Sequence, residues 1–416
     1  MTGKEVPRAV APKVLEALSD TPVVVVNGPR QAGKTTLVRS LPYPGSVEVV
    51  SLDDPTARAA AGDDPRAFVE RPVDTLVVDE AQLEPRLFRA IKASVDANRR
   101  PGRFLLTGSS RLLAAPDMAD ALVGRVETIE LWPFAERELA YSTEPSFIDA
   151  IFDSPRTLVR RGSATRAEIS DRLLRGGFPE AVRRRPPRRR AWFDNYVRTI
   201  TQQVIRELAD LERLADIPRL LALCAARTGT ELNTASIAGE LGIPARTLST
   251  HLAHLSTAFL VRLVPAWSTN LSAKVVRRPK LVMADVGLAA HLQGVTAAGL
   301  DRPQTQFGPL LETLVATEIQ RQLSWSHSFA TLSHFRDRSG VEVDLVLEHP
   351  DGRIVGIEVK ATGTPRTEDL RGLRFLADRL GDRFHFGCLL STALEATPFG
   401  PKLATLPLSS LWDPVR

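Results

Sequence analysis

The stretch that decides the fold of this chain is Gly28-Pro29-Arg30-Gln31-Ala32-Gly33-Lys34-Thr35, which fits the phosphate-loop pattern G-x-x-x-x-G-K-[ST] at every position. It lies between an apolar run at residues 23–26 and a run of helical spacing that begins at Thr36. The glycines let the backbone wrap an anion, so that successive N–H groups and the positive end of the next helix point at it. We therefore predict that residues 28–36 bind ATP, with Lys34 at the β- and γ-phosphates and the Thr35 hydroxyl on Mg²⁺.

A second short apolar strand is expected at residues 75–79, and it ends in the acids Asp79 and Glu80. This arrangement is called Walker B when it follows a phosphate loop. An acid at the carboxyl end of such a strand orients Mg²⁺ through water, and the next acid can polarise an attacking water. We assign Asp79 to the metal and Glu80 to the general base, which predicts hydrolysis as well as binding of ATP.

A third apolar strand, at residues 103–107, runs into Gly108-Ser109-Ser110-Arg111. The carboxyl ends of the strands line the ligand crevice of an open parallel sheet. Ser109 or Ser110 is therefore expected to sense the γ-phosphate or to hold the attacking water, and the alternative is a turn with a helix cap. Arg125 follows a glycine and suits a phosphate of this site or of a neighbouring subunit, and the alternative is a surface charge.

Apolar runs near Val23, Val47, Leu76, Phe104 and Val126 alternate with helical segments such as residues 86–98. This alternation predicts a doubly wound parallel α/β sheet. A chain of 416 residues is too long for one ordinary core. We expect this nucleotide module at residues 1–140, a helical region at 141–230, a helix-turn-helix domain at 231–300 and a carboxyl-terminal module at 301–416.

The composition is that of a globular chain, with 43% hydrophobic and 25% charged residues, and excludes a disordered one. The net charge of +5 permits contact with nucleic acid, although high arginine usage can also reflect codon bias. Cys224 and Cys388 lack metal-ligand spacing, which argues against a zinc site or a disulfide framework. Without a signal-like segment or an apolar run of about 18–20 residues, we expect a cytoplasmic protein with no membrane span.

Residues 145–230 have helical spacing that is interrupted at Gly176-Gly177 and at the run of six arginines and two prolines in 183–190. The prolines exclude a helix through the centre of that run. It either contacts phosphates or forms a solvated linker, and we favour the linker. Four large side chains then recur at helical spacing, and we interpret them as core rather than as a base-stacking platform. These are Trp192, Phe193, Tyr196 and Ile200.

Residues 232–252 predict a helix, a tight turn at Gly242 and a second helix, with a β wing at residues 259–267. The outer face of the second helix is expected to carry Arg246, Thr247, Thr250 and His251. These side chains could reach phosphates or base edges in a major groove of DNA. The pattern resembles a winged helix, a fold that also serves in contacts between proteins, so both DNA binding and protein binding stay open.

Residues 341–347 alternate apolar and acidic side chains, a turn follows at 349–352, and residues 354–360 return as a strand. This pattern predicts a hairpin. A three-residue loop with Gly352 left-handed places Asp344 opposite Glu358 and Glu342 opposite Lys360, whereas a two-residue loop would separate them. Two carboxylates at such a distance repel unless a cation joins them, and Mg²⁺ is the natural occupant. The metal would activate water while Lys360 steadies the developing charge.

This hairpin resembles the site of PD-(D/E)xK nucleases, with Asp344 followed by Glu358-x-Lys360, although Val343 stands where the name has proline. The resemblance implies catalytic roles for these three residues and a metal bound by Asp344, Glu358 and Glu312. Glu312 lies on an expected amphipathic helix at 309–322 and matches the helical acid that often joins such sites. The alternatives are an edge hairpin with solvated charges and a nuclease-like scaffold that binds without cutting.

Nearly the whole chain resembles bacterial and archaeal P-loop ATPases of the AAA+ type, through G-P-R-Q-A-G-K-T-T, L-V-V-D-E-A-Q, L-L-T-G-S-S-R-L and L-V-G-R in this order. The resemblance implies an ATPase domain, a winged-helix middle and a restriction-endonuclease-like α/β domain at the carboxyl end. We expect an ATP-hydrolysing protein that associates with DNA and with copies of itself. The rival hypothesis is a nucleotide-dependent regulatory switch that binds DNA or protein without cleavage.

Overall fold

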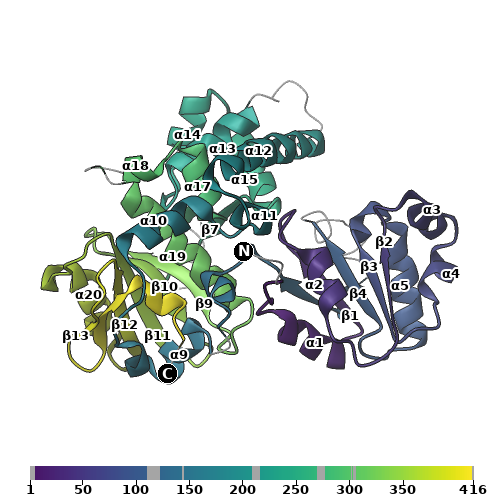
Figure 1. Cartoon of the computed structure of the whole chain (residues 1–416), viewed down its shortest axis with the longest axis horizontal. Coiled ribbons are helices and arrows are strands. Elements are labelled where there is room, and N and C mark those ends of the chain that lie inside the picture. The colour runs from purple at the N-terminus through teal and green to yellow at the C-terminus, as the bar shows by residue number, and fades with distance from the viewer. Residues whose placement is uncertain are drawn as a thin grey trace. The chain divides into compact units, whose positions relative to one another are not determined.

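The computed structural model describes residues 5–109, 122–142, 145–208, 216–268, 277–300, 302 and 306–414, without the side chains of 203 and 205–208. The chain divides into two compact units (Figure 1). The N-terminal unit comprises Thr2–Phe134 with Thr257–Phe259, and the C-terminal unit comprises Ala135–Ser256 with Leu260–Arg416. Each unit is described by itself below.

The N-terminal unit is built on five parallel strands in the order β2-β3-β4-β1-β5, which confirms the predicted parallel α/β sheet. The strands are β1 (Val23–Asn27), β2 (Val47–Ser51), β3 (Thr75–Asp79), β4 (Phe104–Gly108) and β5 (Val126–Glu130). The helices are α1 (Ala11–Asp20), α2 (Lys34–Ser40), α3 (Pro55–Asp63), α4 (Pro65–Val69), the 3-10 turn η1 (Ala81–Leu83) and α5 (Arg86–Ala97).

Burial explains why the strands of this sheet could be recognised in the sequence. Every residue of the central strands β1, β3 and β4 is buried, as the continuous apolar runs of a covered parallel sheet require. On one face, Phe88, Ile91 and Val95 of α5 pack against alternate residues of these strands. The carboxyl ends of β1, β3 and β4 therefore meet at one edge of the sheet, where the predicted phosphate-binding residues lie.

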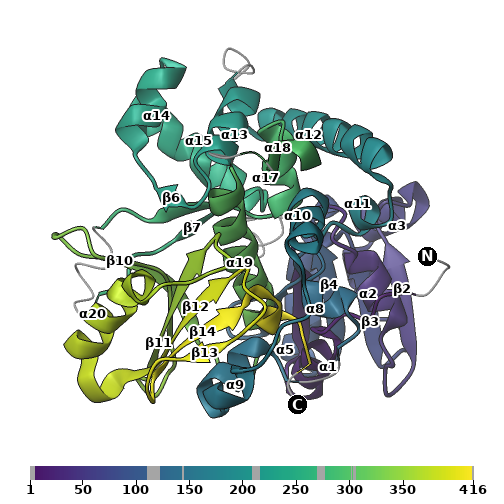
Figure 2. The same cartoon turned by 60° about the vertical axis from the view of Figure 1, so that its left-hand side comes forward.

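The C-terminal unit contains most of the helices and two sheets (Figure 2). Its helices are α8 (Glu136–Leu139), α9 (Phe147–Asp153), α10 (Arg166–Arg175), α11 (Pro179–Val182), α12 (Pro186–Leu208), α13 (Asp216–Ala226), α14 (Thr234–Leu241), α15 (Ala245–Thr257), α17 (Val286–Leu292), α18 (Ala297–Leu300), α19 (Phe307–Leu323) and α20 (Arg371–Leu380). Its 3-10 turns are η2 (Pro155–Leu158), η4 (Thr367–Leu370), η5 (Gly381–Arg383) and η6 (Leu408–Leu411).

The larger sheet of this unit has six strands in the order β13-β14-β12-β11-β10-β9. Its strands are β9 (Thr331–Arg336), β10 (Glu342–Glu348), β11 (Ile354–Lys360), β12 (Phe384–Ser391), β13 (Thr397–Pro398) and β14 (Leu403–Pro407). The predicted hairpin is β10 and β11, with Leu345 paired to Ile357 and Gly352 left-handed at a φ of 90°. The three-residue loop and its register are thereby confirmed.

The smaller sheet is antiparallel in the order β6-β8-β7 and follows two helices in the chain. Its strands are β6 (Thr230–Glu231), β7 (Val261–Val264) and β8 (Lys280–Met283). The predicted helix, turn and second helix are α14 and α15, and Gly242 ends α14 in the left-handed conformation. β7 begins two residues inside the segment where we expected a wing.

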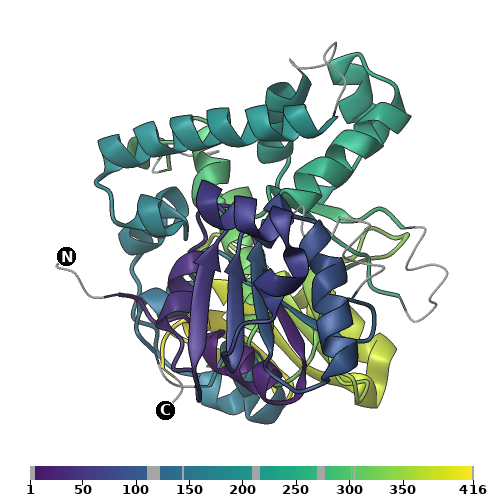
Figure 3. The ribbon, with the colours of Figure 1, turned by 90° about the vertical axis from the view of Figure 1, so that its right-hand side faces the viewer.

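The arginine-rich run at 183–190 is not the linker that the sequence favoured. α11 ends at Val182, and Pro186 opens the 23-residue helix α12, the long teal helix of Figure 3. Proline is tolerated in the first turn of a helix, because its missing N–H would have no partner there. Arg189 is buried, and its guanidinium donates to the carbonyl of Ala181. Of the stripe that follows, Phe193, Tyr196 and Ile200 are buried core as predicted, whereas Trp192 is half-buried and stacks on Tyr196.

Both cysteines of the chain are buried free thiols, Cys224 on α13 and Cys388 on β12. Burial raises the pKa of the Cys224 thiol to about 12 and raises the pKa of Cys388 as well. Both thiols are therefore protonated and inert at neutral pH. Across the described ranges, no helix has the length and apolar character that a membrane crossing requires.

Candidate functional site

The phosphate loop follows β1 and turns into α2 with a backbone that its residue types allow. Gly33 precedes α2 at a φ of 95°, a left-handed conformation that costs glycine little. Gly28 lies so close to the residue that follows β5 that a Cβ on it would lie 2.1 Å from the carbonyl oxygen of Leu131. Only glycine fits at position 28, so the first glycine of the motif is required by packing as well as by turn geometry.

Lys34 is buried at the start of α2, and its ammonium points back into the loop. It donates to the carbonyl oxygens of Gly28 at 3.1 Å and Pro29 at 3.0 Å. Burial lowers the pKa of Lys34 to about 8, against the opposing effect of Glu80 and Asp79. A desolvated ammonium whose hydrogen bonds within the described residues go to carbonyls gains a strong partner when an anion enters the loop.

Asp79 joins the loop to the sheet through both of its carboxylate oxygens. The Thr35 hydroxyl donates to Oδ2 at 2.8 Å, and the hydroxyl of Thr107 on β4 donates to Oδ1. β4 lies between β1 and β3 in the sheet, which is why Thr107 can reach Asp79. The structure thus brings Lys34, Thr35 and Asp79 together at one edge, as the two motifs predicted.

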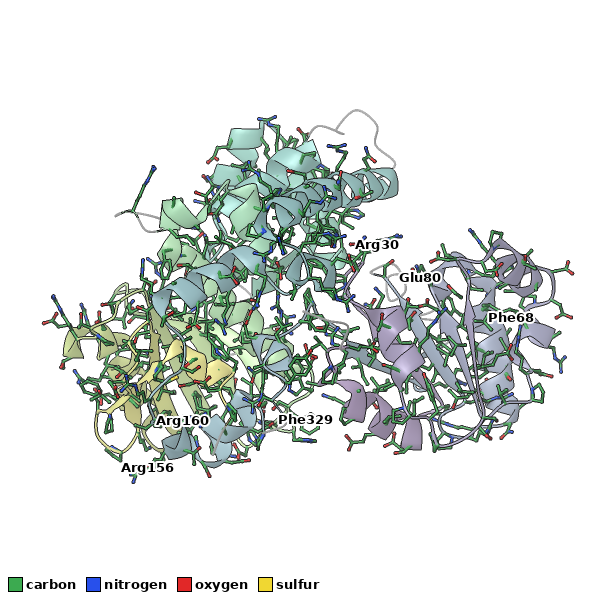
Figure 4. The ribbon with its side chains drawn as sticks, viewed as in Figure 1. Arg30, Phe68, Glu80, Arg156, Arg160 and Phe329 are labelled. Carbon is green, nitrogen blue, oxygen red and sulfur yellow. The ribbon has the colours of Figure 1, made fainter. Side chains whose placement is uncertain are left out.

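Glu80 follows Asp79 in the left-handed conformation, with a φ of 56°. Its N–H donates to the Thr107 hydroxyl at 3.2 Å, and Gln82 donates from Nε2 to its carboxylate. A non-glycine residue held at such a φ costs on the order of 1–3 kcal/mol, and such residues cluster at functional sites. Glu80 and Arg30 lie at the same edge of the N-terminal unit (Figure 4).

Several buried polar atoms at this edge have no hydrogen-bond partner within the described part of the chain. They are Oγ of Ser109, directly after β4, Oδ1 of Asn27, at the end of β1, and Oε1 of Gln82, beside Glu80. Buried polar atoms normally have a partner, and a nucleotide bound at this edge would supply one. Ser110 and Arg111, the other candidates in this loop, lie outside the described residues.

The residues at this edge fit a nucleoside triphosphate with its metal. Loop N–H groups and an ammonium suit phosphate oxygens, and a hydroxyl beside a carboxylate suits Mg²⁺, which prefers oxygen ligands. The buried Ser109 hydroxyl, which has no partner among the described residues, could supply a further hydrogen bond beside them. Arg30 and Gln31 belong to the loop itself, and Thr36 lies in the first turn of α2.

Arg125 is not part of this cluster. It lies before β5, and its carbonyl accepts the N–H of Val23, the first residue of β1. Its guanidinium pairs with Asp96 at 2.6 Å. It therefore lies at the amino ends of the strands, whereas the phosphate loop follows the carboxyl end of β1. The expectation that Arg125 contacts the phosphates bound by its own phosphate loop is therefore wrong.

A second cluster of charged residues lies in the C-terminal unit, on the β10–β11 hairpin. Oδ2 of Asp344 accepts the N–H of Val359 at 2.9 Å, and Nζ of Lys360 lies 3.7 Å from Oε2 of Glu358. Burial and the nearby Asp344 raise the pKa of Glu358 well above its usual value, which favours the protonated form of Glu358 beside Asp344. The predicted side chains do meet on one face of the hairpin.

The cation among these carboxylates is Lys280, a residue that our interpretation of the sequence missed. Its ammonium pairs with Glu312 on α19 and lies 3.4 Å from Oδ1 of Asp344. Burial and Asp344 raise the pKa of Glu312 to about 7, and Lys280 acts against that rise. Burial disfavours ionisation of Asp344, but Lys280 and hydrogen bonds hold the pKa of Asp344 below its usual value. The described residues contain no group of three or more His, Cys, Asp or Glu arranged to hold a metal ion.

A sequence signal for Lys280 did exist, because this lysine opens the apolar run Leu281-Val282-Met283. A lysine in a buried strand needs an acidic partner. Its partners are Glu312 and Asp344, 32 and 64 residues further along the chain, and nothing local identifies them.

The outer face of α15 carries only part of the predicted DNA-contacting set. Arg246 and Thr250 are exposed and Thr247 is half-buried. His251 is buried, with 4% of its surface accessible, so its assignment to DNA is corrected. It precedes Leu252 and lies three residues after Leu248, so helical spacing turns it inward with the core stripe of α15.

Three family descriptions match successive parts of the chain. Residues 20–140 match an AAA domain, residues 166–299 a domain of unknown function (DUF8612), and residues 307–411 a domain of unknown function (DUF4143). Two relatives are "Uncharacterized protein Mb2031c" of Mycobacterium bovis and "Uncharacterized protein Rv2008c" of Mycobacterium tuberculosis. Each is 29% identical over 364 residues, which cover 86% of this chain and 74% of the relative.

Similar solved structures include a Walker-type ATPase of Pyrococcus abyssi, with 16% identity, a TM-score of 0.38, and coverage of 68% of this chain and 94% of that one. A RuvB variant of Thermotoga maritima has 17% identity, a TM-score of 0.26, and coverage of 61% and 87%. These structural likenesses are distant. The match at residues 20–140, the phosphate loop and the five-stranded parallel sheet together support an AAA-type P-loop ATPase domain in the N-terminal unit.

Proposed function

We propose that this protein binds and hydrolyses ATP, with Mg²⁺, at the phosphate loop of its N-terminal unit. The observation that carries the proposal is the hydrogen bond of 2.8 Å between Thr35 and Asp79. It joins the two motifs in space although they lie 44 residues apart. The strained backbone of Glu80, directly after Asp79, supports a functional role for that acid.

The chemistry follows from the side chains at this edge. Lys34 neutralises phosphate charge from a desolvated position, where its attraction is stronger than in water. Thr35 and Asp79 would hold the Mg²⁺, which supplies charge neutralisation on the phosphates. Glu80 would accept a proton from the water whose oxygen bonds to the γ-phosphorus, while the bond from that phosphorus to the β–γ bridging oxygen breaks and ADP leaves. The Ser109 hydroxyl would donate to a γ-phosphate oxygen. Gln82, hydrogen-bonded to Glu80, keeps that carboxylate in place.

Two variants test the site by separating binding from turnover. Lys34→Ala is expected to lose both nucleotide binding and hydrolysis, because the loop loses its ammonium. Glu80→Gln is expected to keep binding and to lower kcat by roughly 10² to 10⁴, the usual contribution of a general base. Phosphate release and binding of a fluorescent ATP analogue measure the two effects. An undiminished hydrolysis rate in Lys34→Ala would refute the assignment.

We further propose that the protein acts on DNA, in the cytoplasm and as a homo-oligomer, with ATP turnover repositioning its C-terminal unit. The net charge of +5 and the exposed Arg246 and Thr250 on α15 support DNA association. The helix pair α14–α15 and the sheet β6-β8-β7 together make up the winged helix of this proposal. Self-association would let Arg125, remote from its own phosphate loop, meet the site of a second copy.

Cleavage of DNA at the hairpin is the second candidate function. The meeting of Asp344, Glu358 and Lys360 on one face supports it. Lys280 already balances the charge of two of the carboxylates, so a divalent ion would have to displace it. The alternative is a nucleotide-dependent regulatory switch whose C-terminal unit binds DNA or protein without cutting.

Incubation of linear and branched DNA with Mg²⁺ or Mn²⁺ separates these alternatives. A nuclease predicts metal-dependent cleavage that disappears in Glu358→Ala, while the exposed control Glu368→Ala keeps it. Intact DNA under both metals, with binding retained, would favour the switch.

A further inference from the structure

A pocket of about 460 Å³ in the C-terminal unit is lined largely by arginines. Half of its eight lining residues are arginines, all of them exposed. They are Arg277, Arg278, Arg336 and Arg338. The remaining lining residues are Glu231, Ala266, His334 and Asp337. Neither the phosphate loop nor the carboxylate hairpin accounts for this pocket.

The floor of the pocket is held rigid by the backbone around His334. The N–H of His334 donates to the carbonyl of Pro265 at 2.9 Å, and the carbonyl of His334 accepts the N–H of Trp267 at 2.6 Å. Burial lowers the pKa of His334 to about 4, so the ring is neutral at pH 7. Its Nε2 lies 3.1 Å from the carbonyl oxygen of Arg278 and donates to it. This hydrogen bond ties the backbone at Arg278 to β9.

Arg336 of the pocket keeps unused donor capacity, and Nη1 of Arg277 donates to the carbonyl oxygen of Arg336 at 3.3 Å. Nη1 of Arg336 lies 3.6 Å from Oε2 of Glu342 and 3.8 Å from Oε2 of Glu231. Both distances are longer than a direct hydrogen bond. Asp337 uses its carboxylate on the N–H groups of Ser339 at 2.9 Å and Val341 at 3.0 Å, within its own turn. Four arginines against two lining acids leave a formal charge of 4 − 2 = +2 in the pocket. The pocket is therefore suited to an anion with several oxygen acceptors.

Pairing between strands places this pocket beside the carboxylate cluster. Glu231 of the pocket is paired with Lys280 across β6 and β8. Arg336 is paired with Glu342 across β9 and β10, and Glu342 lies two residues before Asp344 on the same strand. An anion held by the arginines would thus lie next to the strand positions that carry Lys280 and Asp344.

We propose that this pocket binds phosphate groups of the backbone of a single nucleic-acid strand, without reading its bases. Guanidinium groups match phosphate oxygens in a bidentate geometry. A pocket of about 460 Å³ has the size of a small-ligand site, which suits one or two nucleotides of a strand. Among the described residues that line it, none is a Phe, Tyr or Trp on which a base could stack. This inference rests on the proposed association with DNA and is independent of ATP hydrolysis.

The test measures binding of a fluorescein-labelled single-stranded DNA of about 12 nucleotides by anisotropy, across a range of salt concentrations. The pocket variant is Arg277→Gln/Arg338→Gln. The matched control is Arg156→Gln/Arg371→Gln, which removes the same charge from two exposed sites of the same unit. We expect the pocket variant to bind roughly tenfold or more weakly at about 0.1 M salt. The slope of log affinity against log salt should become shallower by about 0.7 for each phosphate that the variant no longer neutralises.

Three outcomes would overturn the inference. The first is equal affinity of the pocket variant and the wild type, or an equal loss in the control variant. The second is displacement of the DNA by inorganic tripolyphosphate at the same phosphate concentration, which would assign the pocket to free phosphates. The third is equally tight binding of a poly-glutamate peptide that depends on the same two arginines, which would assign it to an acidic protein.

The same assay separates this inference from the proposed function. If Arg246→Gln abolishes DNA binding while the pocket variant keeps it, association through α15 stands and the pocket proposal fails. If the wild type binds no DNA, the proposed DNA association fails as well. Neither result bears on ATP hydrolysis, because Lys34→Ala tests that separately.

Discussion

Lys280 is a buried charge whose partners come from two other elements of the same unit. Removing both members of such a pair from water is costly, and their attraction offsets that cost only when the geometry is good. The ammonium of Lys280 contacts Glu312 on α19 and both the side chain and the carbonyl oxygen of Asp344 on β10. The position of β8 against α19 and β10 is therefore tied to one side chain.

Replacing Lys280 with methionine is expected to destabilise the C-terminal unit by up to roughly 3–5 kcal/mol, because the buried Asp344 and the partly buried Glu312 lose their cation. Urea unfolding measures the loss, with Lys402→Met as the control at an exposed lysine. Adding Glu312→Gln to Lys280→Met should recover part of the stability, since it removes one of the stranded charges. Equal midpoints for Lys280→Met and Lys402→Met would contradict this account.

On the helix α19, too, buried polar side chains find their partners on distant segments of the chain. Its hydrophobic spacing predicted an amphipathic helix with one face in solvent, but most of its 17 residues are buried. Polar side chains on it are satisfied by distant segments. Glu318 accepts the N–H of Glu136 at 3.0 Å, Gln322 donates to the carbonyl of Leu411 at 2.7 Å, and Arg321 pairs with Asp285 at 2.9 Å.

Glu318 should make the stability of this unit depend on pH. Burial raises the pKa of Glu318 from 4.5 to about 7, against the effect of Arg321. Between these pH values the folded chain holds a proton that the unfolded chain releases, so stability falls as pH rises through this window. Glu318→Gln cannot titrate. It should gain stability relative to the wild type between pH 4.5 and pH 8, by at most about 3 kcal/mol.

Chemical unfolding of both proteins at pH 5 and pH 8 measures this difference. Glu368→Gln, at an exposed glutamate of η4, serves as the control and should run parallel to the wild type. A Glu318→Gln profile that also ran parallel to the wild type would show that Glu318 has no such role.

Elements whose determinants are local were predictable from the sequence. The strands of the parallel sheet are continuous apolar runs, and the hairpin register follows from the length of one loop and a left-handed Gly352. Elements whose determinants are distant were not. The partners of Lys280 are Glu312 and Asp344, which lie on other elements, and the polar side chains of α19 are satisfied by α8, η6 and the residue before α17. The start of α12 and the inward side of His251 were local signals that our interpretation of the sequence missed.

Over the whole molecule, the same contrast separates the two candidate sites. The phosphate loop and Asp79 are recognisable because each motif carries its chemistry in a few neighbouring residues, and parallel strands bring their carboxyl ends to one edge. The carboxylate hairpin was also predicted. The lysine inside it was not, because it comes from another sheet of the C-terminal unit. Each unit has its own core, so the two sites are built by separate sets of contacts.

The two buried cysteines have a practical consequence for following the opening of this protein. Cys224 and Cys388 are the two cysteines of the chain, and both belong to the C-terminal unit. A thiol-reactive dye can label them only after the packing around α13 or β12 is broken. The labelling rate therefore measures how often the C-terminal unit opens, and it does not respond to opening of the N-terminal unit. With nucleotide present or absent, it reports whether events at the phosphate loop loosen the other unit.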